Sequence, residues 1–425
     1  MRVLIVGGGG REHALAWAFS RSATVFCAPG NPGTAACATN LPVAAGDQRA
    51  ILDAVRANRV DLTVVGPEAP LADGLADRLS AAGLLVFGPS AAAARIESSK
   101  AFAKEIMASA GVPTARTETF TDSTSALAYI ETHAEPLVVK ASGLAAGKGA
   151  LVCATRAEAA AAARSMFSGK FGDAGSTVLV EDFLEGEELS VFVLTDGEHT
   201  LMLPPSQDHK RLEEGDSGPN TGGMGAYSPV SFATPELLDR VASEVIAPTL
   251  EIMAESGARY RGFLYAGLMI SPTGDPSVVE FNCRMGDPEA QVVLPILGEN
   301  LLEHIGSIAS GDPWDPGEKR LAASGSAVTT VLAAPGYPDA PQKGAEITLP
   351  DSVDTNAVIF QAGTKFDDDG ILRVSGGRVL CATGFGPSVE AAAAASRALA
   401  ETIDFEGKVF RRDIAWREVA RAGIA

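Results

Sequence analysis

The first part of the chain alternates short apolar runs with segments of mixed polarity. Runs of aliphatic and β-branched residues predict buried strands at residues 3–6, 24–27, 61–65 and 84–87. Between these runs, apolar positions recur at helical spacing and predict helices over residues 11–20, 47–58 and 70–82. Because strands and helices take turns, residues 1–98 are predicted to form a small, doubly wound α/β domain with a parallel sheet.

The pattern changes after residue 98, where strands follow one another without a helix between each pair. Strands are predicted at residues 136–140, 150–154, 177–181, 189–194, 200–203, 262–270 and 277–281. Helices are predicted at residues 100–109, 235–256 and 288–310. The stretch 205–228 is rich in Gly, Pro and Asp, and a structureless segment of that length predicts a functional loop. We expect residues 99–322 to form a second domain.

The last hundred residues read as mostly β. Short strands are predicted at residues 326–332, 346–348, 357–360, 372–374 and 379–384, followed by a helix at 388–402. We expect residues 323–425 to form a third, mostly β domain. The chain as a whole is therefore predicted to be an α/β and α+β multidomain protein, which agrees with its 425 residues, too many for one core.

Composition narrows the choice of partners. The net charge of −19 disfavours binding to nucleic acid or to an acidic membrane. The five cysteines are scattered without a CxxC pair, which indicates neither a zinc site nor a disulfide framework and fits a reducing compartment. The N-terminus is a strand rather than a signal peptide, and no run approaches the roughly 20 apolar residues of a membrane span. We expect a cytoplasmic protein, and nothing in the sequence demands more than a monomer.

The densest chemical signal lies at residues 279–289. Glu280 and Asn282 are two apart on a predicted strand, so their side chains share one face. A carboxylate beside an amide oxygen suits Mg²⁺, which takes one or two carboxylates together with the phosphates of its substrate. Arg284 follows closely and can meet a phosphate or carboxylate with its planar guanidinium. The alternative is a strand end with solvated polar residues.

The glycine run 7–10 suggests a dinucleotide-binding fingerprint, but the pattern fails. Glu12 and His13 stand where the last glycine would be required, and no acidic residue ends the second strand. The run therefore predicts either a tight turn or a seat for a phosphate or carboxylate at a helix N-terminus. An oxidoreductase that uses NAD is disfavoured.

Residues 138–149 predict a strand, a small-residue loop and a second strand. The segment from Gly143 to Lys148 is one residue short of a P-loop and lacks a Ser or Thr after the lysine. It suits a mobile flap in which glycine N–H groups surround phosphate oxygens while Lys140 and Lys148 supply charge. A plain hairpin is the alternative.

Two further segments are candidates for ligand binding. In the acidic stretch 181–188, backbone groups near Phe183 could bond an adenine edge and Glu188 could bond ribose hydroxyls, although a solvated turn is the alternative. Within 205–228, Lys210 and Arg211 are candidate partners of phosphate or carboxylate, and the glycines of 219–227 allow close approach of the backbone. Here a disordered tip is the alternative.

Taken in order, these segments resemble the ATP-grasp ligases and, more narrowly, the phosphoribosylamine–glycine ligase family. The resemblance rests on GGGGREHALAW (7–17), APGNPGTA (28–35), VGPEAPL (65–71), FGPS (87–90), SSKAFAKE (98–105), VVKASGLAAGKG (138–149), SQDHKR (206–211), GPNTGGMGAYSP (218–229), GFLYAGLM (262–269), EFNCRMGDPEAQ (280–291) and GGRVLCATGFG (376–386). It covers essentially the whole chain, and the ordered set is far more specific than any one motif.

The resemblance implies an ATP-dependent ligation of glycine to 5-phosphoribosylamine through glycyl phosphate, with Mg²⁺ or Mn²⁺. It implies catalytic roles for Arg284, Lys148, Asp208 and Lys210, and metal ligation by Glu280 and Asn282. It places ATP on Lys100, Lys140, Gly147, Lys148, Gly149, Glu181, Phe183, Leu184 and Glu188. It places the other substrates on Gly9, Gly10, Arg11, Glu12, Gly30, Asn31, Pro67, Glu68, Gly223, Met224, Gly225, Arg284, Gly286 and Asp287. A lid over about residues 118–190 is expected because glycyl phosphate must be kept from water.

The sequence departs from the family pattern at two positions. Met285 stands where an aromatic residue or Leu is usual, and Ala290 replaces a frequent Thr. Met fills apolar space well, so altered packing is expected rather than lost chemistry. The rival readings are another ATP-grasp carboxylate–amine ligase or a carboxylase, and a nucleotide-binding regulator without catalysis.

Overall fold

The computed structural model describes residues 1–145, 147–298 and 300–423. Its N-terminal sheet has the strand order β3-β2-β1-β4-β5, and every pairing is parallel. The strands are β1 (Arg2–Gly7), β2 (Thr24–Pro29), β3 (Thr39–Asn40), β4 (Leu62–Val65) and β5 (Val86–Phe87), with helices α1 (Gly10–Phe19) and α2 (Gln48–Ala57) between them. The predicted doubly wound α/β layout is confirmed. Its strand order reverses between β1 and β4, the point of an open sheet where ligands bind.

One helix prediction in this region was wrong. Residues 70–82 form no single helix but lie in α3 (Glu68–Ala72) and α4 (Leu75–Ala81). Gly74 separates the two helices with a φ of 83°, a left-handed conformation that ends a helical run. Because α3 begins at Glu68, it places that carboxylate directly after the β4 loop.

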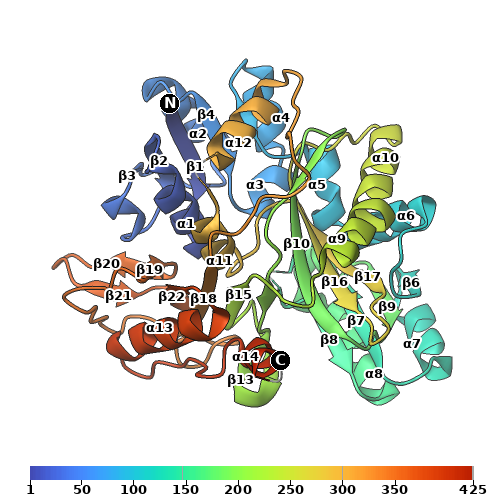
Figure 1. Ribbon diagram of the computed structural model, residues 1–425. Coiled ribbons are helices and arrows are strands. Elements are labelled where there is room, and N and C mark those ends of the chain that lie inside the picture. Colours follow the sequence, from blue (N-terminus) through green and yellow to red (C-terminus); the bar gives the residue numbers. More distant parts are fainter. Residues whose placement is uncertain (146, 299, 424–425) are drawn as a thin grey trace.

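The middle of the chain forms two antiparallel sheets. The larger has the order β11-β10-β16-β17 and the smaller the order β6-β9-β7-β8. Their strands are β6 (Thr117–Phe120), β7 (Leu137–Ala141), β8 (Ala150–Cys153), β9 (Val178–Asp182), β10 (Glu187–Thr195), β11 (Thr200–Met202), β16 (Gly262–Ile270) and β17 (Pro276–Asn282). Figure 1 shows the smaller sheet, with α7 (Ser123–Thr132) and α8 (Arg156–Ser165), on one side of the larger sheet.

The helices of this region match the predictions only in part. The predicted helix 100–109 is α6 (Lys100–Ala110), and it follows α5 (Ala91–Ser98). The predicted helix 235–256 is α9 (Pro235–Arg240) and α10 (Ala247–Glu255) joined by a π-helical segment, Val241–Ile246. The predicted single helix 288–310 was wrong, and part of it falls on residue 299, outside the described residues. It divides into α11 (Ala290–Val293), a 3₁₀ turn (Leu294–Ile296) and α12 (Leu301–Ser310), with a bend of 106°.

The prediction of a loop without strands at 205–228 was also wrong. The segment holds β12 (Gln207–Asp208), β13 (Arg211–Glu213), β14 (Ser217–Asn220) and β15 (Gly225–Ser228). β12 and β15 extend a sheet whose other strands come from the end of the chain, in the order β12-β15-β18-β22-β19. Backbone pairing with β18 stabilises this glycine-rich sequence, and a local pattern does not reveal a partner about a hundred residues away.

The C-terminal region is mostly antiparallel β, as predicted. Its elements are β18 (Ser326–Ala333), β19 (Ala357–Gln361), β20 (Thr364–Phe366), β21 (Leu372–Val374), β22 (Arg378–Gly386), α13 (Val389–Thr402) and α14 (Trp416–Ala422). The predicted strand 346–348 is wrong, since only isolated bridges to Arg373 and Asp404 occur there. The short helix α14 was not predicted.

The three regions share their apolar cores. One buried cluster contains Leu4 of β1, Leu264 of β16 and Val328 of β18. A second joins Ile5, Phe192 and Val331 in the same way. Burial of apolar surface therefore holds the regions in one arrangement around the space between them (Figure 1).

No single helix within the described residues is long and apolar enough to cross a membrane. The bent pair Ala290–Ile296 and Leu301–Ser310 reaches that length and composition only when its two helices are taken together.

Candidate active site

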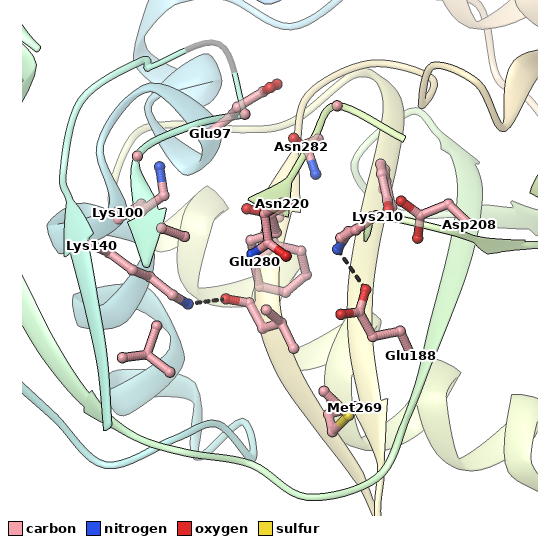
Figure 2. A pocket seen from close by; sticks show the side chains of 18 of the residues that line it. Glu97, Lys100, Lys140, Glu188, Asp208, Lys210, Asn220, Met269, Glu280 and Asn282 are labelled. Atoms are coloured by element: carbon pink, nitrogen blue, oxygen red, sulfur yellow. Dashed lines mark hydrogen bonds and ion pairs between the residues drawn. The ribbon is translucent and has the colours of Figure 1, made fainter. Parts of the chain in front are cut away.

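A cavity of about 840 Å³ lies where the three regions meet (Figure 2). Seventeen of the predicted site residues line it: Arg11, Pro67, Glu68, Lys100, Lys140, Gly147, Gly149, Glu181, Phe183, Leu184, Glu188, Asp208, Lys210, Glu280, Asn282, Arg284 and Asp287. They come from the N-terminal and the middle regions of the chain. The fold therefore brings most of the predicted chemistry into one site.

One side of the cavity combines two lysines with a buried carboxylate. The Nζ atoms of Lys140 and Lys104 lie 2.8 and 3.2 Å from the two carboxylate oxygens of Glu181. Lys104 was not predicted, although it follows Lys100 by one helical turn on α6. Apolar residues line the same cavity: Ala103, Met107, Val138, Met269 and Phe281. The arrangement offers an apolar slot with cations at its edge.

Glu280 and Asn282 lie side by side at the end of β17, as their spacing predicted (Figure 2). Burial raises the pKa of Glu280, but Lys210, Lys100, Lys140 and Arg284 outweigh it, and the pKa of this carboxyl is lowered on balance. The buried amide nitrogen of Asn282 has no hydrogen-bond partner among the described residues. The Glu280 carboxylate and the unpaired amide nitrogen of Asn282 are thus available to a ligand in the cavity.

The donor set fits a magnesium-type ion that is held largely by its substrate. No group of three or more His, Cys, Asp or Glu residues that could hold a metal occurs within the described parts of the chain. Mg²⁺ needs no such cage, since one or two protein oxygens suffice when phosphates and water complete the octahedron. Glu280 and Asn282 therefore fit Mg²⁺ bound together with a nucleotide, and they do not form an independent structural metal site.

Arg284 is held between two carboxylates. Its Nη2 lies 2.7 Å from an oxygen of Glu97, and its Nε lies 3.2 Å from an oxygen of Glu68. Glu97 also accepts a hydrogen bond of 2.7 Å from the N–H of Cys283, which fixes the chain next to the arginine. Sequence reasoning missed Glu97, because nothing local marks a buried acid at the end of α5.

A further lysine lies across the cavity. Lys210 Nζ is 2.6 Å from a carboxylate oxygen of Glu188 (Figure 2). The neighbouring Asp208 is buried, and its carboxylate has no hydrogen bond or ion pair with any described residue, so burial raises its pKa despite the nearby Lys210. Tyr265 donates a hydrogen bond of 2.9 Å to Glu289, a further buried acid at the cavity.

Lys148 does not line the cavity in this structure. Its Nζ donates a hydrogen bond of 2.6 Å to the carbonyl oxygen of Pro338 in the C-terminal region. The flap tip thus contacts the loop that precedes Asp339, and the predicted role of Lys148 at phosphate requires the side chain to leave this partner.

The glycine turn after β1 is filled by the protein itself. Gly9 donates its N–H to the Glu12 carboxylate at 2.7 Å, and a Cβ placed on Gly66 would lie 2.2 Å from the same carboxylate. Glu12 therefore lies against this turn and accepts the N–H of Gly9, the residue before α1. The remaining predicted residues do not line the cavity but lie in the loops behind it: Gly9, Gly10, Glu12, Gly30, Asn31, Gly223, Met224, Gly225 and Gly286.

Arg378 joins two of these loops from the C-terminal sheet. Its guanidinium donates to the carbonyl oxygens of Gly222 and Asp287, and Nη2 lies 3.5 Å from the Asp287 carboxylate. A Cβ on Gly223 would lie 2.5 Å from Pro288, so the two loops pack closely. Arg378 was not predicted because its partners are distant in sequence. The C-terminal region therefore reaches the cavity, where Arg378 and Arg417 are among the lining residues.

Comparison with known structures identifies the class of protein. The chain matches a crystal structure of Thermotoga maritima phosphoribosylamine–glycine ligase with a TM-score of 0.86 and 38% identity, covering 97% of this chain and 100% of that one. The biotin carboxylase domain of Hydrogenobacter thermophilus 2-oxoglutarate carboxylase, determined with MgADP and bicarbonate, matches with a TM-score of 0.73 at 19% identity, covering 96% and 91% of the two chains. The fold is that of the ATP-grasp enzymes.

Family and sequence comparisons are more specific. Phosphoribosylglycinamide synthetase N, ATP-grasp and C domains match residues 1–97, 98–290 and 327–417. Phosphoribosylamine–glycine ligases of Pasteurella multocida and Salmonella typhimurium are 48% and 46% identical to this chain, over 99% of the chain and of each relative. The chain belongs to the phosphoribosylglycinamide synthetase family, and the resemblance read from its motifs is confirmed.

The Arg378 bridge predicts a stability effect that depends on pH. Burial raises the pKa of Asp287, but Arg378 and Arg11 together outweigh burial. The pKa of this carboxyl is therefore lowered on balance, and the carboxylate stays charged. Arg378→Met should destabilise the protein by about 2 kcal/mol at pH 7, because a buried charge loses its partner. A carboxyl with a depressed pKa contributes stability above its unfolded pKa and loses it as pH falls through the folded value. The difference from the unmodified protein should therefore shrink in acid, as measured by urea unfolding.

The exposed Arg397 offers a matched control, and Arg397→Met should change stability by less than about 0.5 kcal/mol. Equal effects of the two substitutions, or a difference that grows in acid, would contradict the bridge.

Proposed function

We propose that this chain is an ATP-dependent ligase that joins glycine to 5-phosphoribosylamine, giving glycinamide ribonucleotide, ADP and phosphate in purine biosynthesis. One observation carries the proposal. A chain of this family, matched along its whole length, brings Lys140, Lys210 and Arg284 around the Glu280–Asn282 pair in one cavity. Cations around a metal-type oxygen pair suit the transfer of a phosphoryl group.

ATP is proposed to lie along the smaller sheet and the flap. The apolar slot beside Met107 and Met269 suits the adenine ring, with the backbone of Phe183 and Leu184 at its edge and Glu188 on the ribose. Lys100 and Lys140 then face the phosphates, and Gly147 and Gly149 lie where the flap can cover them. Lys148 reaches the phosphates if it exchanges its Pro338 carbonyl for them.

Mg²⁺ or Mn²⁺ is proposed to bind Glu280 and Asn282 together with the ATP phosphates. There it would supply positive charge that stabilises the transferred phosphoryl group. The residues of the chain do the rest. Arg284 is held rigidly by Glu68 and Glu97, so its guanidinium is oriented before substrate arrives. Lys210 and Lys140 neutralise charge from either side.

The proposed reaction has two steps. A carboxylate oxygen of glycine attacks the γ-phosphorus of ATP, and ADP leaves, giving glycyl phosphate. The amine nitrogen of phosphoribosylamine then attacks the acyl carbon; phosphate leaves with the oxygen that came from glycine, and the nitrogen loses a proton. Water would destroy the acyl phosphate, so closure over residues 118–190 serves the chemistry by excluding it.

Phosphoribosylamine is proposed to bind on the side opposite ATP. Arg11, Pro67, Glu68 and Asp287 line the cavity there. The glycines around Gly9, Gly30 and Gly223 back these loops. We also propose that the domains divide at residues 98 and 322. The protein is proposed to be a monomer that acts in the cytoplasm without nucleic-acid or membrane partners.

The first test is phosphate release from Mg-ATP with glycine, with phosphoribosylamine generated in situ, with both, and with bicarbonate. Release should require glycine and phosphoribosylamine together and should equal the glycinamide ribonucleotide found by mass spectrometry. Release driven by bicarbonate would instead indicate a carboxylase with the same fold, and binding of Mg-ATP without release would indicate a regulator.

The metal proposal predicts a large loss in one isosteric variant. Glu280→Gln keeps the side-chain shape but removes the ionised ligand, so ligation should fall by at least about 100-fold, in the range seen when one electrostatic contact to a transition state is removed. Circular dichroism should show a folded protein. Glu244→Gln, which alters an exposed pair with Arg240, should keep full activity. Turnover of Glu280→Gln near that of the unmodified enzyme would remove Glu280 from the metal site.

A further inference from the structure

His209 lies between Asp208 and Lys210, two residues of the proposed active site, yet the proposed chemistry gives it no role. The backbone ladder of β12 continues through it, because His209 N–H donates to Gly225 O at 2.8 Å and Met224 N–H donates to His209 O at 2.7 Å. Side chains alternate along an extended chain, so Asp208 and Lys210 face the cavity while His209 points to the other side. Figure 2 shows Asp208 and Lys210 close together at the cavity.

The His209 ring is buried against the C-terminal segment. Its side chain is 0% exposed, and Nε2 accepts a hydrogen bond of 2.9 Å from the N–H of Ala415. The proton of the neutral ring is therefore on Nδ1, which lies 3.6 Å from a carboxylate oxygen of Asp216. Burial lowers the pKa of His209, which keeps the ring neutral and Nε2 free to accept.

The partner of His209 is itself rigidly held. Ala415 has a φ of 67°, a left-handed conformation that non-glycine residues seldom adopt unless their surroundings impose it. Four residues earlier, the buried Arg411 donates two hydrogen bonds of 2.8 Å to the Asp413 carboxylate. Arg411 also donates to Asp216 at 2.9 Å. The conformation of segment 411–415 is thus held by its own hydrogen bonds, independently of its contact with His209.

The same segment is fastened to the hairpin that follows Lys210. Arg411 donates to the carbonyl oxygen of Arg211 at 3.0 Å, and Gly215 N–H donates to Asp413 at 2.8 Å. The chain from residue 208 to 216 is therefore anchored at His209 and again at the hairpin. The hairpin also reaches the cavity, since Arg211 and Asp216 are among the residues that line it.

We infer that His209 is a positioning residue, which with segment 411–415 holds the chain at 208–210 so that Asp208 and Lys210 face the substrates. The inference rests on the proposed ligase function. Its physical basis is that a shift of about 1 Å in a catalytic group can cost on the order of 100-fold in rate. The Lys210–Glu188 pair at 2.6 Å shows how closely the lysine is placed.

A matched pair of substitutions separates positioning from packing. In His209→Gln the terminal amide oxygen can reach the place of Nε2 and accept from Ala415, whereas in His209→Asn the shorter side chain reaches only the place of Nδ1. His209→Asn should lower kcat by at least about 10-fold, while KM for ATP stays within about twofold. His209→Gln should retain at least about a third of kcat. His199→Asn, at an exposed histidine in the turn after β10, should be unchanged.

Arg411→Lys provides a second test, because it loosens segment 411–415 while His209 stays intact. It should also lower kcat without raising KM for ATP. Fluorescence-monitored melting of each variant, with and without Mg-ATP, reports the folded fraction and nucleotide binding.

The inference is overturned if His209→Asn keeps the kcat of the unmodified enzyme, or if His209→Gln and His209→Asn lose activity equally. It is also overturned if the loss of activity in each variant is fully explained by its smaller folded fraction. If the unmodified enzyme itself fails to ligate, the proposed function falls and the inference with it. That outcome is recognised before any variant is compared.

Discussion

The site depends on keeping several charges ionised in a space that is largely removed from water. Burial raises the pKa of Glu280 and lowers that of Lys100, so at both groups it disfavours the charged form. Each is supported by charges of opposite sign, and Glu280 is one of the groups that act against burial at Lys100. Buried charges are tolerable only when paired in this way. The fold brings these oppositely charged groups together.

All three regions of the chain contribute to this arrangement of charges. Arg284 of the middle region is held by Glu68 and Glu97, which precede it by about two hundred residues. The C-terminal region supplies no residue of the proposed phosphoryl-transfer step, yet Arg378 joins two cavity loops and segment 411–415 supports a third. Such contacts explain why a mostly β region with few candidate catalytic residues belongs to the enzyme. It fixes the geometry on which positioning catalysis depends.

The sequence predicted whatever depends on local pattern or on motif order. The parallel sheet, the β17 pair Glu280 and Asn282, and the flap strands around Lys140 all lie where periodicity and spacing placed them. It failed where a distant segment decides the outcome. β12 and β15 exist because β18 pairs with β15, about a hundred residues further along the chain. Glu97, Lys104 and Arg378 were missed for the same reason, since a single charged residue carries no signal until its partner is known.

The central claim is that this cavity activates a carboxylate by phosphorylation, and isotope transfer tests it most directly. Glycine labelled with ¹⁸O in both carboxylate oxygens would be turned over with Mg-ATP and phosphoribosylamine, and the released phosphate analysed by mass spectrometry. The account predicts one ¹⁸O atom in each phosphate, because the oxygen that attacked phosphorus leaves with it. Phosphate without label, formed alongside glycinamide ribonucleotide, would contradict an acyl phosphate and with it the role given to this site.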